Sequence, residues 1–295
     1  VMCIVIGKYF PEIGWVAVKN RDRNYIPEIS FKKVQENGVE TMFFWDDVTQ
    51  YCEGFNSAGV GVLGASLMVL DDEKEIEKRT KTPSKDGQRI RQALMNASVR
   101  SVAASLIKSG LTGNTLVFDR ETMILIESAK KDGEFHFRAR VIPHDKFVVR
   151  TNHGVWLPWA GYQRGEDDNQ TMSRISSESR RTIAEIVTAQ AGDPEDILDG
   201  LTQNYTGNPQ LNALRTTTEK KKMRTTSQIL IVPKERTMYV RPVQSHMKFN
   251  FWELNKEDQQ TWVEILSNRA LYMNLKKDDL GQDPPFDHSL NHDTE

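Results

Sequence analysis

The sequence is poor in cysteine: two cysteines among 295 residues cannot build a disulfide framework. A net charge of −2 gives no excess of one sign, which argues against a nucleic-acid binder that works by bulk electrostatics. Long hydrophobic runs are also missing, since the longest, Val60–Leu70, is about half of a membrane span. The hydrophobic and charged fractions, 38% and 27%, exclude a disordered or collagen-like chain. We therefore expect a globular protein with neither a membrane nor a nucleic-acid partner.

Motifs for metals and nucleotides are absent as well. None of the six histidines belongs to a zinc-type motif or to a Cys/His cluster with ligand spacing. There is no P-loop, and Gly59, Gly61 and Gly64 match a dinucleotide fingerprint imperfectly, inside an apolar strand. We therefore expect no metal and no cofactor.

Hydrophobic patterns predict an α+β domain in which helix layers cover the sheets. Runs rich in Val and Ile predict strands at Cys3–Phe10 and Trp15–Asn20, joined by a turn. Further strands are expected at Val60–Leu70, Thr115–Asp119, Thr122–Ser128, Phe135–Ile142, Lys146–Arg150, Ser227–Val232 and Thr237–Val243. Helical spacing marks Gln88–Ser109, Thr171–Gln190, Asp196–Gln203 and Glu257–Leu275. No linker divides the chain, so we expect one domain over residues 1–275 and a loosely ordered polar tail over residues 276–295.

The start of the chain has no basic leader and no small-residue cleavage site, so it does not read as a secretory signal. This favours a cytoplasmic protein. Val1-Met2 stands directly ahead of Cys3.

Polar residues lie at the ends of several predicted strands, where a rigid backbone can fix a functional group. They are Cys3, Lys19-Asn20-Arg21-Asp22, Asn56 to Ser66 around the buried strand, and Arg150-Thr151-Asn152-His153. Each has an ordinary alternative. A lone cysteine in an apolar strand is most often core, as we expect for Cys52. Asp22 suits a surface ion pair, Asn152 a turn cap, and the arginines of residues 171–190 a solvated helix face.

Taken in order, these segments resemble the choloylglycine hydrolase and penicillin V acylase family of N-terminal nucleophile hydrolases. They are more loosely similar to acyltransferases that act on 6-aminopenicillanic acid. The motifs that carry the resemblance are Met2-Cys3, Lys19-Asn20-Arg21-Asp22, Glu53 through Val60, Thr151-Asn152, Ser173-Arg174-Ile175, Leu214-Arg215-Thr216 and Arg224-Thr225-Thr226-Ser227. The resemblance runs from Cys3 to about Val243 and implies a four-layer αββα sandwich.

The resemblance also implies an activity, the cleavage of a linear non-peptide C–N amide bond of a small N-acyl amide through an acyl-enzyme. Cys3 would be the nucleophile, freed as the first residue of the mature chain. Asp22 would orient it by accepting hydrogen bonds from the thiol or the α-ammonium. The oxyanion hole would consist of the Asn152 amide and the backbone N–H of Ser66.

The resemblance further implies basic residues that hold Cys3 and Asp22 in place. Lys19 stands where the family has arginine, which turns a bidentate fork into a point charge. Arg174 matches a second family arginine, while Arg181 and Asn56 are supporting residues, and Arg180-Arg181 offers another match for that arginine. A homo-oligomer agrees with the family.

The chemistry needs the thiol and the amine on one residue. A free thiol is only partly thiolate at neutral pH, whereas an α-amino group with a pKa of about 7.7–8.0 can serve as base and acid. An N-terminal cysteine fixes the distance between the two groups covalently, which is why the nucleophile has to be residue one.

Three rival interpretations remain at this stage. An acyltransferase would use the same acyl-enzyme. A non-catalytic binding protein would keep the fold, with Cys3 buried behind Val1-Met2. An ordinary cysteine hydrolase would use His153 or His144 as its base.

The substrate stays open among bile salts, penicillin V, N-acyl homoserine lactones and other N-acyl amides. We expect loops at Asn24–Asn37, Asp71–Lys85 and Trp156–Gln170 to set specificity. Trp156 and Trp159 either line an apolar acyl pocket or pack in the core.

Overall fold

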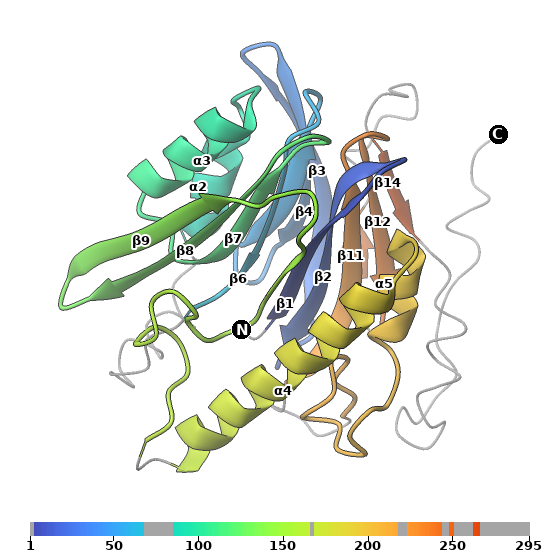
Figure 1. The fold of residues 1–295 in the computed structure, drawn as a ribbon. Coiled ribbons are helices and arrows are strands. Elements are labelled where there is room, and N and C mark those ends of the chain that lie inside the picture. The colour runs from blue at the N-terminus through green and yellow to red at the C-terminus, as the bar shows by residue number, and fades with distance from the viewer. Residues whose placement is uncertain are drawn as a thin grey trace.

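The computed structural model describes residues 3–67, 85–165, 168–217, 223–243, 248–250 and 262–265. Two β-sheets lie face to face, and helices cover the outer surface of each sheet (Figure 1). The predicted α+β class and the four-layer αββα arrangement are confirmed.

The six-stranded sheet has the order β10-β1-β2-β11-β12-β14. Its strands are β1 (Cys3–Phe10), β2 (Gly14–Arg23), β10 (Val148–Arg150), β11 (Arg224–Val232), β12 (Thr237–Pro242) and β14 (Trp262–Ile265). The turn between β1 and β2 needs Gly14, because its φ is +91° and a Cβ there would lie 2.4 Å from the Arg120 carbonyl oxygen. The two predicted strand pairs, β1 with β2 and β11 with β12, are both present.

The eight-stranded sheet has the order β13-β3-β4-β5-β6-β7-β8-β9. Its strands are β3 (Glu28–Glu36), β4 (Val39–Asp46), β5 (Cys52–Asn56), β6 (Gly61–Ala65), β7 (Gly113–Phe118), β8 (Met123–Lys131), β9 (Glu134–Val141) and β13 (Lys248–Asn250). From β3 to β9 every neighbouring pair is antiparallel and consecutive in the chain. The strands predicted within residues 60–70 and 115–142 are confirmed where they are described.

Four helices cover the sheets: α2 (Asp86–Ala93), α3 (Val99–Lys108), α4 (Asp168–Gln190) and α5 (Pro194–Gly200). On the six-stranded sheet, Ile4 and Val18 pack against Ile183 and Leu198 of α4 and α5. On the eight-stranded sheet, the buried residues Phe43, Val62 and Val117 pack against Ile90, Val102 and Leu106 of α2 and α3. Because each strand alternates its side chains between two faces, one set of residues faces a helix layer and the other fills the space between the sheets.

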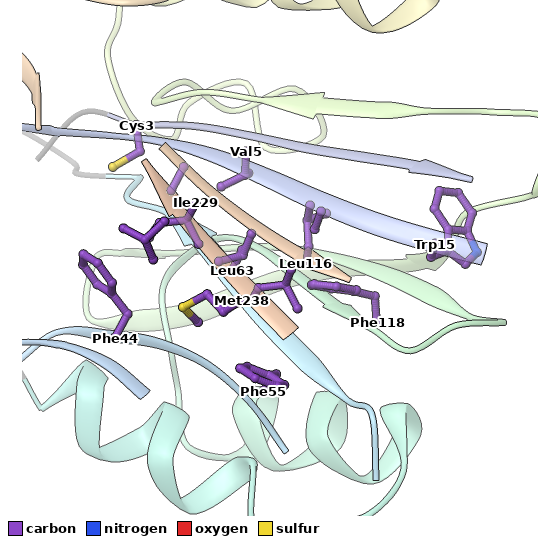
Figure 2. Close-up of a cluster of buried hydrophobic side chains, with 14 of the residues drawn as sticks. Cys3, Val5, Trp15, Phe44, Phe55, Leu63, Leu116, Phe118, Ile229 and Met238 are labelled. Atoms are coloured by element: carbon purple, nitrogen blue, oxygen red, sulfur yellow. The ribbon is translucent and has the colours of Figure 1, made fainter. Parts of the chain in front are cut away.

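The apolar interior between the sheets comes from both of them (Figure 2). Val5, Trp15 and Ile229 of the six-stranded sheet meet Phe55 and Leu116 of the other. Figure 2 shows Cys3 at one end of this cluster and Trp15 at the opposite end. The interior therefore leads directly to the first residue of β1.

Three predictions of local structure were wrong. The single helix expected over Gln88–Ser109 is two helices, because Ser98 caps a new one by accepting a hydrogen bond from the Ser101 N–H. The loop expected over Asn24–Asn37 contains β3. Within the helix expected over Glu257–Leu275, Trp262–Ile265 is strand β14, parallel to β12.

Other predictions fall outside the described residues. These are most of the Asp71–Lys85 loop, the rest of Glu257–Leu275 and the tail over residues 276–295. The domain limits therefore stay predictions. In the described part of the chain, no helix combines the length and apolar character that crossing a membrane requires.

Candidate active site

The candidate site is built around Cys3, the first described residue. Cys3 begins β1, pairs with Arg21 of β2 and has none of its surface exposed. Its side chain points into the space between the sheets, at one end of the apolar cluster (Figure 2). Two neighbouring central strands thus hold the thiol in place.

The polar end of β2 presents charged side chains on both faces of the sheet. Lys19 pairs with Glu53 of β5, and Arg21 pairs with Asp46 of β4, so the odd-numbered residues face the other sheet. Asp22 binds Arg180 of α4, so it faces the helix layer. All of these side chains are buried. The two-residue period of a strand explains the split.

Lys19, Arg21, Arg23, Asp46 and Glu53 form what we call the inter-sheet ion cluster. Arg23 lies at 3.5 Å from Asp46 and donates through Nη1 to the Cys3 sulfur, also at 3.5 Å. Three cations face two carboxylates in this cluster, which leaves one positive charge beside the thiol. A Cys3 thiolate would balance that charge.

The electrostatics of Cys3 agree with this balance. Burial raises the pKa of the thiol, but the charges of Lys19 and Arg23 outweigh burial, and the pKa lies below its ordinary value. The backbone N–H of Asp22 also donates to the sulfur and lowers the pKa further. The site therefore favours the nucleophilic form of the side chain.

Asp22 differs from its predicted role in how it meets Cys3. Its carboxylate binds Arg180 at 2.7 Å, Thr225 Oγ1 at 2.9 Å and Arg215 at 3.8 Å. The recorded hydrogen bond to Cys3 comes from the Asp22 backbone instead. The carboxylate thus ties β2 to α4 and β11, and this fixes the backbone N–H that reaches the sulfur.

Asn152 connects the backbone nitrogen of Cys3 to Ser66, which follows β6 of the other sheet. Its Oδ1 accepts a hydrogen bond from the Cys3 backbone nitrogen at 2.8 Å, and its Nδ2 donates to the Ser66 carbonyl at 2.8 Å. The predicted pair of Asn152 and Ser66 is therefore brought together beside Cys3. Ser66 contributes its carbonyl to this contact, whereas its predicted N–H role stays untested.

Among the arginines of α4, the structure places Arg180 at the site. Arg174 binds Glu178 at 2.7 Å and the Tyr162 carbonyl at 3.0 Å, and Arg181 binds Glu185 at 2.8 Å. None of these contacts involves Asp22, so Arg180, and not Arg174, is the α4 arginine that binds the Asp22 carboxylate. Helical spacing could have identified Arg180 as the inward-facing arginine. It lies on the buried face of α4 with Ser176, Ser177, Ile183, Ala184 and Val187.

Asn56 lies away from the site. It donates to the carbonyls of Leu94 and Asn96 at 2.9 Å and accepts from the Val60 N–H at 2.9 Å. It thereby joins the β5–β6 turn to the end of α2, at the end of β6 remote from Ser66. The structure therefore does not bring Asn56 together with Cys3, and its supporting role stays a prediction.

Neither histidine of the rival interpretation is recorded in contact with Cys3. His153 hydrogen-bonds Ser177 at 2.8 Å, and burial together with Arg174 lowers its pKa to about 4. His144 stacks on Tyr9 at 4.0 Å, six residues or about 20 Å along β1 from Cys3. His153 is a packing residue on the α4 side, and His144 belongs to the far end of the sheet.

The segment that follows Asn152 folds back on itself. The Tyr162 N–H donates to the Asn152 carbonyl at 3.0 Å, and His153 bridges Gly161. Gly161 has a φ of +74°, and a Cβ there would lie 2.3 Å from the Asn152 carbonyl oxygen. This close approach holds the backbone of Asn152 and explains why glycine is required.

Sequence reasoning missed Arg23 and Tyr162. It included Arg215 and Thr225 in its motifs without giving either a role, and it offered Arg180 only as an alternative to Arg174. Tyr162 is half-buried, and burial raises its pKa. The charges that also act on that pKa are those of Arg215, Arg180, Cys3 and Asp22. The spacing along β2 could have identified Arg23. It lies two residues beyond Arg21 and four beyond Lys19, so the three side chains share one face of the strand.

The tryptophans proposed for an acyl pocket pack against cations. The centroid of the Trp156 ring lies 4.9 Å from the Arg150 Cζ and 5.1 Å from the Arg140 Cζ. The Lys131 Nζ lies 5.7 Å from the centroid of the Trp159 ring, and the His136 ring contacts Trp159 edge to face at 5.4 Å. Their part in a pocket stays a prediction. Within the described ranges, His, Cys, Asp and Glu do not gather in a group of three that suits a metal ion.

No family model and no curated protein matches the chain. Solved structures do match. A variant of the conjugated bile acid hydrolase of Clostridium perfringens has 13% sequence identity and a TM-score of 0.45, over 81% of this chain and 89% of that one. The penicillin V acylase of Agrobacterium tumefaciens has 11% identity and a TM-score of 0.42, over 81% and 86%. Both names fall within the family that the sequence motifs resemble.

Proposed function

We propose that this protein is an amidohydrolase that cleaves a small N-acyl amide with Cys3 as an N-terminal nucleophile. One observation carries the proposal: both reactive atoms of Cys3 have a dedicated partner. Its sulfur lies beside Arg23, and its nitrogen donates to Asn152. A cysteine that served only as core would need neither contact.

The proposed reaction begins with the Cys3 thiolate, which the inter-sheet ion cluster stabilises. The sulfur attacks the amide carbonyl carbon and forms a C–S bond, and the negative charge moves to the carbonyl oxygen. Asn152 and the N–H of Ser66 are the proposed donors to this oxyanion. The tetrahedral intermediate then collapses, and the C–N bond breaks.

The leaving amine takes its proton from the α-ammonium of Cys3, which becomes a free amine. That amine then acts as the base that deprotonates water, and the hydroxide attacks the thioester. Hydrolysis releases the carboxylic acid and restores the thiolate. This cycle requires Cys3 to be the first residue, since an amide nitrogen can play neither role.

The test compares chains that differ only at the nitrogen or sulfur of Cys3. We expect a chain that starts at Cys3 to release amine from one or more members of an N-acyl amide panel. Retaining Val1-Met2 removes the general base and lowers the rate by about 10²–10⁴-fold. The Cys3→Ala variant should be inactive.

Cys52 provides the matched control. It is the second buried cysteine, it packs under α2 and α3, and burial raises the pKa of its thiol. The Cys52→Ala variant should therefore keep its activity. Equal activity in the chain that retains Val1-Met2, or activity in Cys3→Ala, would overturn the proposal.

A further inference from the structure

We propose that the outer edge of β9 pairs with β9 of a second copy of this chain, in antiparallel orientation about a two-fold axis at Phe137. Strand β9 is the last strand of the eight-stranded sheet, and no described strand pairs with its other side. Figure 1 shows it at the outer margin of the molecule, beyond α2 and α3. The proposal is independent of the catalytic one.

The phase of the hydrogen bonds shows which backbone groups face outward. The Ile142 N–H donates to the Met123 carbonyl, so Ile142 and Met123 form a hydrogen-bonded pair at the end of the β8–β9 ladder. Such pairs alternate along an antiparallel ladder, so the even-numbered residues of β9 bond to β8. The N–H and C=O groups of Phe135, Phe137, Ala139 and Val141 therefore point to the open edge.

The same odd-numbered residues form an exposed apolar stripe. Phe137 is 45% exposed and Val141 is 58% exposed, and the rings of Phe135 and Phe137 stack at 6.0 Å. They lie on the α3 face of the sheet, because Ile124 and Ile126, the β8 partners of Val141 and Ala139, pack under α3. The opposite face of β9 is partly covered, since Arg140 and His136 contact Trp156 and Trp159.

On its odd-numbered face, the edge lacks several of the usual features that prevent strand addition. Its eight residues pair with β8 without a register shift, and they contain no proline and no lysine. Natural proteins generally protect an open edge with a bulge, a proline, charged side chains or a short strand. The charged residues of β9, Glu134, Arg138 and Arg140, all lie on its even-numbered face. An edge without a bulge, whose odd-numbered face carries only apolar residues, leaves its outward backbone groups open to a further strand.

Charge complementarity selects a second copy as the partner. With Phe137 opposite its own copy, Glu134 faces Arg140 of the other chain twice, and Phe135 faces Ala139. The outward-facing residues Phe135, Phe137 and Ala139 then all meet outward-facing partners. Moving the register one step toward the C-terminus would place Arg138 opposite Arg138, which is unfavourable.

The experiment measures the mass of the whole protein by sedimentation over a wide range of concentrations. We expect self-association to twice 33.8 kDa. Two variants should return the mass to that of the monomer. Phe137→Lys places like charges on the axis, and Ala139→Pro removes an outward N–H without touching the bonds to β8.

A charge exchange tests the register. Glu134→Arg alone and Arg140→Glu alone should each weaken the dimer at least tenfold, and the double variant should restore it. Ile186→Lys is the control, since Ile186 is 48% exposed on α4, away from β9. A monomeric parent protein, a dimer that survives both edge variants, or equal disruption by Ile186→Lys would overturn the proposal.

Discussion

At the scale of single residues, the state of Cys3 depends on positive charges that all come from one strand, β2. Lys19 and Arg23 outweigh the burial of the thiol, and Asp46 and Glu53 neutralise only two of the three cations of the inter-sheet ion cluster. Asp22 lies between Lys19 and Arg23 in the sequence, but its side chain faces the helix layer, where it binds Arg180 of α4. The polar run from Lys19 to Arg23 therefore acts on both faces of β2. Its odd-numbered side chains set the charge around the sulfur, and the Asp22 carboxylate anchors the backbone N–H that donates to the sulfur.

The pKa of Cys3 tests this arrangement. Because Lys19 lowers that pKa, Lys19→Met should raise it, whereas Lys19→Arg, which keeps the charge, should leave it low. The thiolate of the parent protein then persists at a pH where the Lys19→Met variant is already protonated. The measurement is a pH titration of ¹³C-labelled cysteine by NMR in a Cys52→Ala background, which leaves a single signal. An unchanged midpoint in Lys19→Met would contradict the account.

At the scale of elements, the sequence could predict a strand or helix only where the segment's own residues determine its conformation. The strands at Cys3–Phe10 and Thr122–Ser128 follow from their own Val and Ile content. Strand β14 could not be predicted, because Trp262–Ile265 owes its conformation to pairing with β12. The choice among the arginines of α4 depends on helical periodicity. Once the helix is known, its buried face includes Arg180 and leaves out Arg174 and Arg181.

The short segment from Asn152 to Tyr162 is the element that positions the nitrogen side of the site. Gly161→Ala should displace the Asn152 backbone, because the new Cβ would lie 2.3 Å from its carbonyl oxygen. A displacement of this kind lowers activity by about a hundredfold. Gly207→Ala is the matched control, since Gly207 has a similar φ of +70° but no atom within 4 Å. Amine release by the two variants is compared, and equal rates would show that this segment does not position Asn152.

At the scale of the whole molecule, the two sheets meet in an interior that is apolar along most of its length and ionic at one end. Trp15 and Phe118 belong to the apolar part, whereas the inter-sheet ion cluster joins β2 to β4 and β5 beside Cys3. Buried ion pairs add little net stability compared with apolar packing. Their concentration at the end that holds the thiol indicates a chemical purpose, and sequence alone could not show it because the partners lie on different sheets.

The central claim is that Cys3, as the first residue of the mature chain, carries the acyl group. Intact-protein mass spectrometry of material made in cells and treated with an electrophilic acyl reagent tests it directly. The account predicts a chain that begins at Cys3 and bears one adduct, on Cys3 and not on Cys52. A chain that keeps Val1-Met2, turns over substrate at the full rate and carries no adduct on Cys3 would contradict it.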